Sequence, residues 1–133
     1  MPALLACGLS ARDLPHKDHV WTGDVSILDG DTRSDPWVKI EAGGSHCQSD
    51  PIHNTEDPEW TLCCSFGCAT SPCTVVFTVY DKDLIGDDTI GTVQLSSDQP
   101  GERWEALDGG EGELRVSITV YLPPPSPPVP SLS

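Results

Sequence analysis

The chain has 133 residues, of which 37% are hydrophobic, 21 are acidic and only 7 are basic, so its formal net charge at pH 7 is −14. This length suits one domain with a modest core, and the apolar content is too high for a disordered chain. The negative charge argues against nucleic-acid binding and against a polybasic membrane anchor, so contact with an anionic surface would require a bridging cation.

Strict alternation of apolar and polar residues predicts strands in this chain. It is clearest near the end, where Leu114, Val116 and Ile118 alternate with polar neighbours. Turn residues such as Gly43-Gly44 and Asp57-Pro58 separate the runs. We expect eight strands, near residues 3–12, 36–42, 46–53, 59–66, 74–80, 89–95, 103–107 and 112–122. This count and spacing predict an all-β fold, an eight-stranded antiparallel sandwich over residues 1–122.

Two stretches interrupt the strand rhythm. Residues 15–34 form one long connection, and long loops on a rigid sandwich often carry function. Residues 123–133 read PPPSPPVPSLS, which predicts an extended polyproline segment that acts as a tail or a linker. No apolar run approaches the roughly 20 residues of a membrane-spanning helix, and the first residues lack the basic region of a signal peptide.

Acidic residues gather where the predicted strands end. They occur in the segment Asp29–Asp35, in Asp81-Lys82-Asp83 directly after a strand, and in Asp87-Asp88 just before another. Several carboxylates in one place repel one another strongly unless a cation binds between them. Calcium accepts six to eight oxygen ligands in a flexible geometry, whereas zinc would favour His or Cys. The pattern therefore predicts a Ca²⁺ site.

Four motifs in order resemble those of a C2 domain. They are Ser34-Asp35-Pro36-Trp37-Val38-Lys39-Ile40, Asn54-Thr55-Glu56-Asp57-Pro58-Glu59-Trp60, Val79-Tyr80-Asp81-Lys82-Asp83 and Asp88-Thr89-Ile90-Gly91. The closing segment from Gly112 to Pro123 resembles the last strand of that family. The resemblance implies a Greek-key sandwich in the type II circular arrangement. Within the family, Gly43-Gly44, Ser65-Phe66-Gly67 and 81–91 look most like the extracellular perforin-type C2 domain.

The resemblance also implies which residues bind calcium. The implied ligands are Asp29 and Asp35 from the first loop and Asp81, Asp83 and Asp88 from the third. The first loop is longer than the family pattern, so Asp18 or Asp24 could replace Asp29. The third loop is one residue shorter than usual, so Asp87 could share or take the role of Asp88.

The implied function is calcium-dependent binding to anionic phospholipid membranes, without catalysis. Leu84 and Ile85 at the third-loop tip, and Trp21 in the first loop, are the apolar residues expected to contact the membrane. The perforin-type resemblance suggests a link to extracellular defence or membrane attack. The alternative is a protein-interaction or adhesion module in which calcium is only structural. No catalytic or phosphate-binding motif occurs, which favours a non-enzyme.

Six cysteines favour structural disulfides and hence a secreted, extracellular protein at the membrane surface, with a cytoplasmic location left open. Neighbours on a strand point to opposite faces, so Cys63 and Cys64 should have different partners. We expect one of them to pair with Cys68 or Cys73, and Cys7 to pair with Cys47.

The remaining candidate residues carry weaker patterns. The four histidines, His16, His19, His46 and His53, form no recognised ligand spacing. Trp37 and Trp60 are expected to face the core.

Overall fold

The computed structural model describes residues 3–14, 35–53, 55–68, 72–82, 87–109 and 111–121. Eight strands run through these ranges: β1 (Ala3–Arg12), β2 (Pro36–Ala42), β3 (Ser45–Gln48), β4 (Glu59–Gly67), β5 (Thr74–Lys82), β6 (Asp87–Ser96), β7 (Gly101–Ala106) and β8 (Glu113–Tyr121). Within the same ranges, no helix has the length and hydrophobicity needed to cross a membrane. The predicted tail at 123–133 lies outside the described residues.

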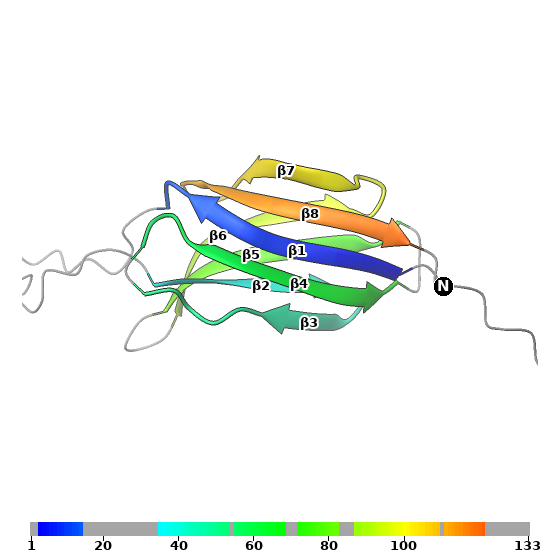
Figure 1. Ribbon diagram of the computed structural model, residues 1–133, viewed down its shortest axis with the longest axis horizontal. Helices are drawn as coiled ribbons and strands as arrows, with labels where there is room; N and C mark the ends of the chain where they lie inside the picture. The colour runs from blue at the N-terminus through cyan, green and yellow to red at the C-terminus, as the bar shows by residue number, and fades with distance from the viewer. Residues whose placement is uncertain are drawn as a thin grey trace, which may run out of the picture.

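The strands form two four-stranded antiparallel sheets that pack face to face (Figure 1). One sheet has the order β4-β1-β8-β7 and the other the order β3-β2-β5-β6. The first and last strands of the domain are therefore neighbours in one sheet, as a circular arrangement requires. The predicted eight-stranded antiparallel sandwich is confirmed.

The core lies between the two sheets and is built by the inward-facing residue of each alternating pair. Every second residue of β2, from Pro36 to Ala42, is buried, and the residues between them are half-buried or exposed. The largest fully buried apolar side chains are Phe77, Leu4, Leu14, Ile40, Ile90, Leu114 and Ile118. Burial of side chains of this size stabilises the fold by about 1.5–3 kcal/mol each.

The two ends of the sandwich differ in their connections. At one end β1, β3 and β5 finish and β2, β4 and β6 begin; we call it the aspartate end, because Asp35, Asp81 and Asp88 lie there. The opposite end, called the far end, carries the Gly43-Gly44 turn between β2 and β3 and the start of β1 (Figure 1). Both glycines of this turn have positive φ angles, 58° and 82°, which glycine adopts without strain.

Three disulfides link the sheets and strands, and their pairing differs from the prediction. Cys7 on β1 pairs with Cys63 directly opposite on β4, and Cys47 on β3 pairs with Cys64. Cys68 and Cys73 pair with each other across the connection between β4 and β5. Cys63 and Cys64 do have different partners, as expected. The predicted Cys7–Cys47 pair is wrong because β4, not β3, is the neighbour of β1, so Cys63 lies directly opposite Cys7. The predicted bond from Cys63 or Cys64 to Cys68 or Cys73 is also wrong, because β4 and β5 form no hairpin and Cys68 and Cys73 bond each other.

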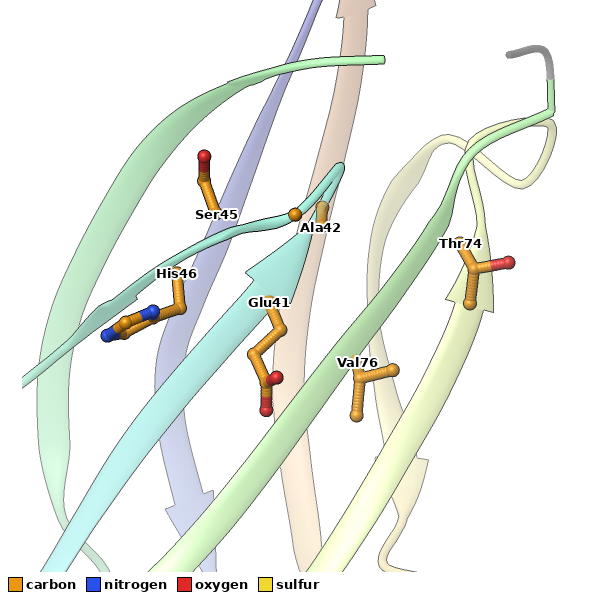
Figure 2. Close-up of a pocket in the computed structure, with 7 residues that line it drawn as sticks. Glu41, Ala42, Ser45, His46, Thr74 and Val76 are labelled. Atoms are coloured by element: carbon orange, nitrogen blue, oxygen red, sulfur yellow. The ribbon is translucent and has the colours of Figure 1, made fainter. Parts of the chain in front are cut away.

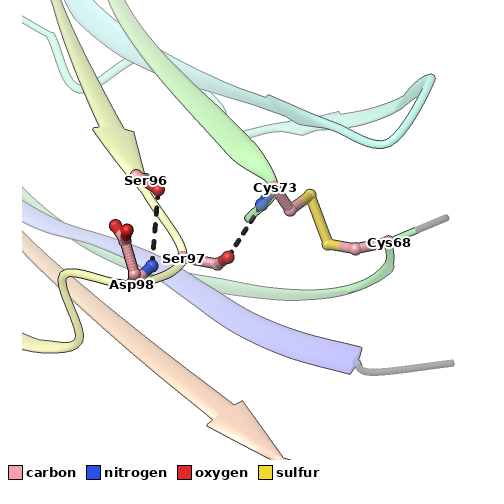
Figure 3. The surroundings of a disulfide bond; sticks show 5 residues. All are labelled: Cys68, Cys73, Ser96, Ser97 and Asp98. Carbon is pink, nitrogen blue, oxygen red and sulfur yellow. Dashed lines mark hydrogen bonds between the residues drawn. A yellow bond between two sulfur atoms is a disulfide. The ribbon is translucent and has the colours of Figure 1, made fainter. Parts of the chain in front are cut away.

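The Cys68–Cys73 disulfide is anchored by the neighbouring turn at the far end. The backbone N–H of Cys73 donates to Ser97 Oγ at 2.8 Å (Figure 3). Ser97 N–H donates in turn to the Cys73 carbonyl at 2.8 Å. Next to this contact, Asp98 N–H donates to Ser96 Oγ at 3.4 Å. The Cys68–Cys73 pair and the turn after β6 therefore form one linked unit.

Two local predictions need correction. The third strand ends at Gln48 instead of extending to residue 53, because Pro51 has no N–H and Val38 N–H donates to Ser49 Oγ instead of a backbone carbonyl. Trp37 does not face the core: it is half-buried on the outer face of β2, where it stacks on Tyr80 with ring centroids 4.4 Å apart. Trp60 packs against the core as predicted.

Candidate metal centre

The pairing of β2, β5 and β6 brings three of the predicted aspartates to one place. Pro36 lies opposite Asp81 in the β2–β5 pair, and Asp81 lies opposite Asp88 in the β5–β6 pair. Asp35 directly precedes Pro36, so the three residues follow one another across the aspartate end of this sheet. In the sequence, Asp81 follows Asp35 by 46 residues, and Asp88 follows Asp81 by 7.

A β-bulge in β6 decides which aspartate lies opposite Asp81. The register shifts between Val79, which pairs with Gly91, and Tyr80, which pairs with Thr89, so that Ile90 is the additional residue. Ile90 is fully buried, and the shift pairs Asp88 with Asp81 and Asp87 with Lys82. Because paired residues on neighbouring strands share a face of the sheet, the register favours Asp88 over Asp87 as the partner of Asp81.

Asp81 is the most deeply buried acidic residue in the described part of the chain, with an exposed fraction of 0%. It continues the inward alternation of Phe77 and Val79 along β5, which explains why its side chain points between the sheets. Its Oδ1 accepts a hydrogen bond from the Asp35 backbone N–H at 2.9 Å. The Asp35 carbonyl in turn accepts from Lys82 N–H at 3.0 Å, so the backbones of both segments are locked together.

The connection between β3 and β4 reaches the same place. Ile52 N–H donates to the Pro36 carbonyl at 3.0 Å, and Trp60 Nε1–H donates to the same carbonyl at 3.1 Å. The next residue, His53, places its Nδ1 3.1 Å from Asp35 Oδ1. Histidine spacing gave no indication of this contact, because it depends on the backbone bond between Ile52 and Pro36.

Several predicted site residues lie outside the described residues. These are the ligands Asp29 and Asp83, the alternatives Asp18 and Asp24, and the membrane-contacting residues Trp21, Leu84 and Ile85. Asp87 is described through its backbone pairing alone. Among the side chains that the structure does describe, no group of three or more His, Cys, Asp or Glu could by itself hold a metal ion. The described aspartates would therefore supply only part of a calcium site.

The chemistry of this partial donor set fits calcium. Asp35, Asp81 and Asp88 contribute only carboxylate oxygens, the ligand type that calcium prefers, and every cysteine is in a disulfide. Burial of the Asp81 carboxylate carries a desolvation cost, which the Asp35 N–H offsets in part and which a cation would offset further. Asp88 is exposed, so its carboxylate is accessible from solvent.

Two shallow hollows are seen on the described surface, and neither contains the three aspartates. One, of about 320 Å³, lies at the far end and is lined by Glu41, Ser45, His46, Thr74 and Val76, among others (Figure 2). The other, of about 380 Å³, runs between residues 48–52 and 59–62. Neither holds a set of polar groups that resembles a catalytic site.

Comparison with known proteins identifies the family. The C2 domain family matches residues 5–112 of the chain. The chain is 30% identical over 129 residues to Multiple C2 and transmembrane domain-containing protein 1 of Mus musculus, and 28% identical over 127 residues to Extended synaptotagmin-3 of the same species. These matches cover 84% and 86% of this chain but only 14% of each relative.

Solved structures show the same fold. A structure of a C2 domain matches 92% of this chain and 100% of its own chain, with a TM-score of 0.70 and 24% identity. A calcium-bound structure of two C2 domains of Extended-Synaptotagmin 2 matches 89% of this chain and 45% of its own, with a TM-score of 0.75 and 22% identity.

Proposed function

Because this chain belongs to the C2 domain family, we propose that it is a calcium-dependent phospholipid-binding module without catalytic activity of its own. The proposal covers the domain as residues 1–122, with residues 123–133 as a proline-rich tail or linker. Calcium is the implied cofactor and an anionic phospholipid membrane the implied partner.

The observation that carries the proposal is the strand register at the aspartate end. It pairs Asp81 with Asp88 and holds Asp35 against Asp81 through the 2.9 Å backbone hydrogen bond. Three carboxylates delivered to one end of a rigid sheet are the start of an oxygen-rich cation site. We propose Asp29 and Asp83 as the remaining ligands.

The charge of the chain explains why membrane binding would depend on calcium. With a net charge of −14, the protein is repelled by an anionic membrane surface. Bound calcium would supply local positive charge and open coordination positions for lipid phosphate or carboxylate oxygens. Leu84 and Ile85, which follow the last residue of β5 at the aspartate end, and Trp21 are the side chains we propose to enter the interface.

Sedimentation with liposomes tests the proposal directly. The purified domain is mixed with phosphatidylserine-containing liposomes in millimolar calcium and, separately, in EDTA, and the pelleted fraction is measured. We expect pelleting with calcium and none with EDTA, and neutral phosphatidylcholine liposomes should pellet less of the protein. Absence of pelleting in all conditions would refute the membrane-binding function.

A protein-interaction or adhesion module, with calcium only structural, is the second candidate. The stacked Trp37 and Tyr80 on the outer face of β2 and β5 favour it, because both rings are only half-buried and aromatic residues are enriched at protein interfaces. Calcium binding without liposome pelleting would support this candidate.

An extracellular setting is the finer part of the proposal. All six cysteines are paired within the chain, which agrees with an oxidising compartment and with the perforin-type resemblance, and hence with a role in extracellular defence or membrane attack. Peptide mapping of protein isolated from its native source, with free thiols blocked at lysis, tests this point. Blocked thiols at these cysteines would contradict it.

A further inference from the structure

We propose that His53 is a positioning residue for the calcium site: it holds the Asp35 carboxylate in place from the connection between β3 and β4. The inference rests on the proposed calcium function and extends it to a segment that supplies none of the five proposed ligands. The observation behind it is the 3.1 Å separation of His53 Nδ1 and Asp35 Oδ1. At this distance, an Nδ1–H donates a hydrogen bond to a carboxylate.

A backbone hydrogen bond ties the residue before His53 to the residue after Asp35. The preceding residue, Ile52, donates its N–H to the Pro36 carbonyl, and Pro36 directly follows Asp35. Trp60 Nε1–H donates to the same carbonyl from β4. The imidazole therefore approaches Asp35 from a segment that is tied to the residue next to Asp35. The His53 side chain is 78% exposed and the Asp35 side chain 25% exposed, so the position of the imidazole depends on this backbone contact and not on burial.

The contact would fix the orientation of the Asp35 carboxylate. With Oδ1 lying 3.1 Å from His53 Nδ1 and the Asp35 backbone bonded to Asp81 and Lys82, the carboxylate is oriented before a cation arrives. A ligand that is already oriented loses less conformational freedom on binding. Calcium affinity should therefore depend on a histidine that is not itself a calcium ligand.

Four variants test the role of Nδ1. His53→Ala removes the donor. His53→Asn keeps an N–H donor at the position that Nδ1 occupies relative to Cγ, whereas His53→Gln carries its donor one bond further out, at the position of Nε2. His46→Ala is the control, because His46 is exposed at the far end of the sandwich. Calcium affinity is measured by isothermal titration calorimetry at pH 7.5, and the Asp35 carboxyl carbon is followed by NMR in calcium-free protein.

We expect His53→Ala and His53→Gln to bind calcium about three- to ten-fold more weakly, the range that one hydrogen bond accounts for. His53→Asn should stay close to the wild type in affinity and in the Asp35 carboxyl shift, and His46→Ala should be unchanged. Equal affinity in all variants, or a loss in His53→Asn as large as that in His53→Ala, would overturn the positioning role. A wild-type protein that binds no calcium would instead refute the proposed function itself.

Discussion

The disulfide between Cys47 and Cys64 provides the most quantitative test of the fold. It joins β3, an edge strand of one sheet, to β4, an edge strand of the other, so it holds the two layers together along one side of the sandwich. Both cysteines are half-buried and pack against the core. Replacing both by alanine removes the link and leaves only a small volume unfilled, so the main effect should come from the lost covalent constraint.

The expected loss follows from the length of the closed loop. The two cysteines are 17 residues apart, and in the chain-entropy model a loop of that length stabilises the fold by about 3 kcal/mol at 25 °C. For a domain of this size, the loss corresponds to a decrease in Tm of about 10 °C. The same relation gives about 4 kcal/mol for Cys7–Cys63, separated by 56 residues, and about 2 kcal/mol for Cys68–Cys73, separated by 5.

Urea denaturation followed by tryptophan fluorescence, in buffer without reductant and with EDTA present, measures these losses. The three double-alanine variants should rank in the order of their loop lengths, with Cys47→Ala/Cys64→Ala between the other two. A loss below about 1 kcal/mol for this variant would refute the reasoning. It would mean that the disulfide does not restrict the unfolded chain as the chain-entropy model assumes. Excess dithiothreitol reduces all three disulfides, so the wild type should lose more stability in it than any of the three double-alanine variants loses.

Three further substitutions test the site and the packing. Asp88→Asn should weaken calcium binding by about an order of magnitude, because it removes one carboxylate charge from the site, whereas Asp98→Asn at the far end should not; calorimetry compares them. Trp60→Phe keeps one aromatic ring but loses the pyrrole part of the indole, and with it the Nε1–H bond to the β2 carbonyl, so it should cost at least the roughly 0.5–1.5 kcal/mol of that hydrogen bond in urea denaturation. Gly91→Ala would place a Cβ 2.8 Å from a leucine Cβ and should cost about 1–3 kcal/mol, whereas Gly67→Ala meets nothing within 4 Å and should cost less.

Each of these predictions has an outcome that contradicts it. Equal calcium affinity in both asparagine variants would remove Asp88 from the ligand set. A Trp60→Phe domain as stable as the wild type would mean that water replaces the lost hydrogen bond without cost. Equal stability of the two glycine variants would show that the β6 bulge region relaxes to accept a side chain.

The strands were predictable because alternation is a local property of the sequence. Seven of the eight expected strands overlap the observed ones closely, and the eighth, near 46–53, begins correctly and stops early at Gln48. The early stop depends on two local features, Pro51 and the Ser49 hydroxyl that accepts from Val38 N–H. Such a side-chain acceptor competes with the ladder only when the partner strand is in place, so alternation alone does not reveal it.

The site was less predictable because it depends on register and loop contacts. Acidic spacing pointed to Asp81, Asp87 and Asp88 as candidates but could not choose between Asp87 and Asp88, since the bulge at Ile90 decides which one lies opposite Asp81. Cysteine spacing could not give the pairing either, because Cys47 and Cys64 meet only when the two edge strands lie next to each other. His53 was missed for the same reason: its partner is 18 residues earlier in the sequence and is reached through a loop.

The positions of the disulfides also separate the stability of the domain from its proposed calcium site. Cys68–Cys73 lies at the far end, tied to Ser97, so a folded variant without it should lose stability and keep its calcium affinity. Cys47 lies one residue before the end of β3, where the connection that carries His53 begins. Removal of the Cys47–Cys64 disulfide should therefore lower both the stability of the domain and its calcium affinity. Calcium titrations of the two double-alanine variants, performed where both are fully folded, compare these effects. Equal calcium affinity in the two variants would mean that the connection between β3 and β4 holds Asp35 without help from the disulfide, and that the bond from Ile52 to Pro36 is sufficient to position His53.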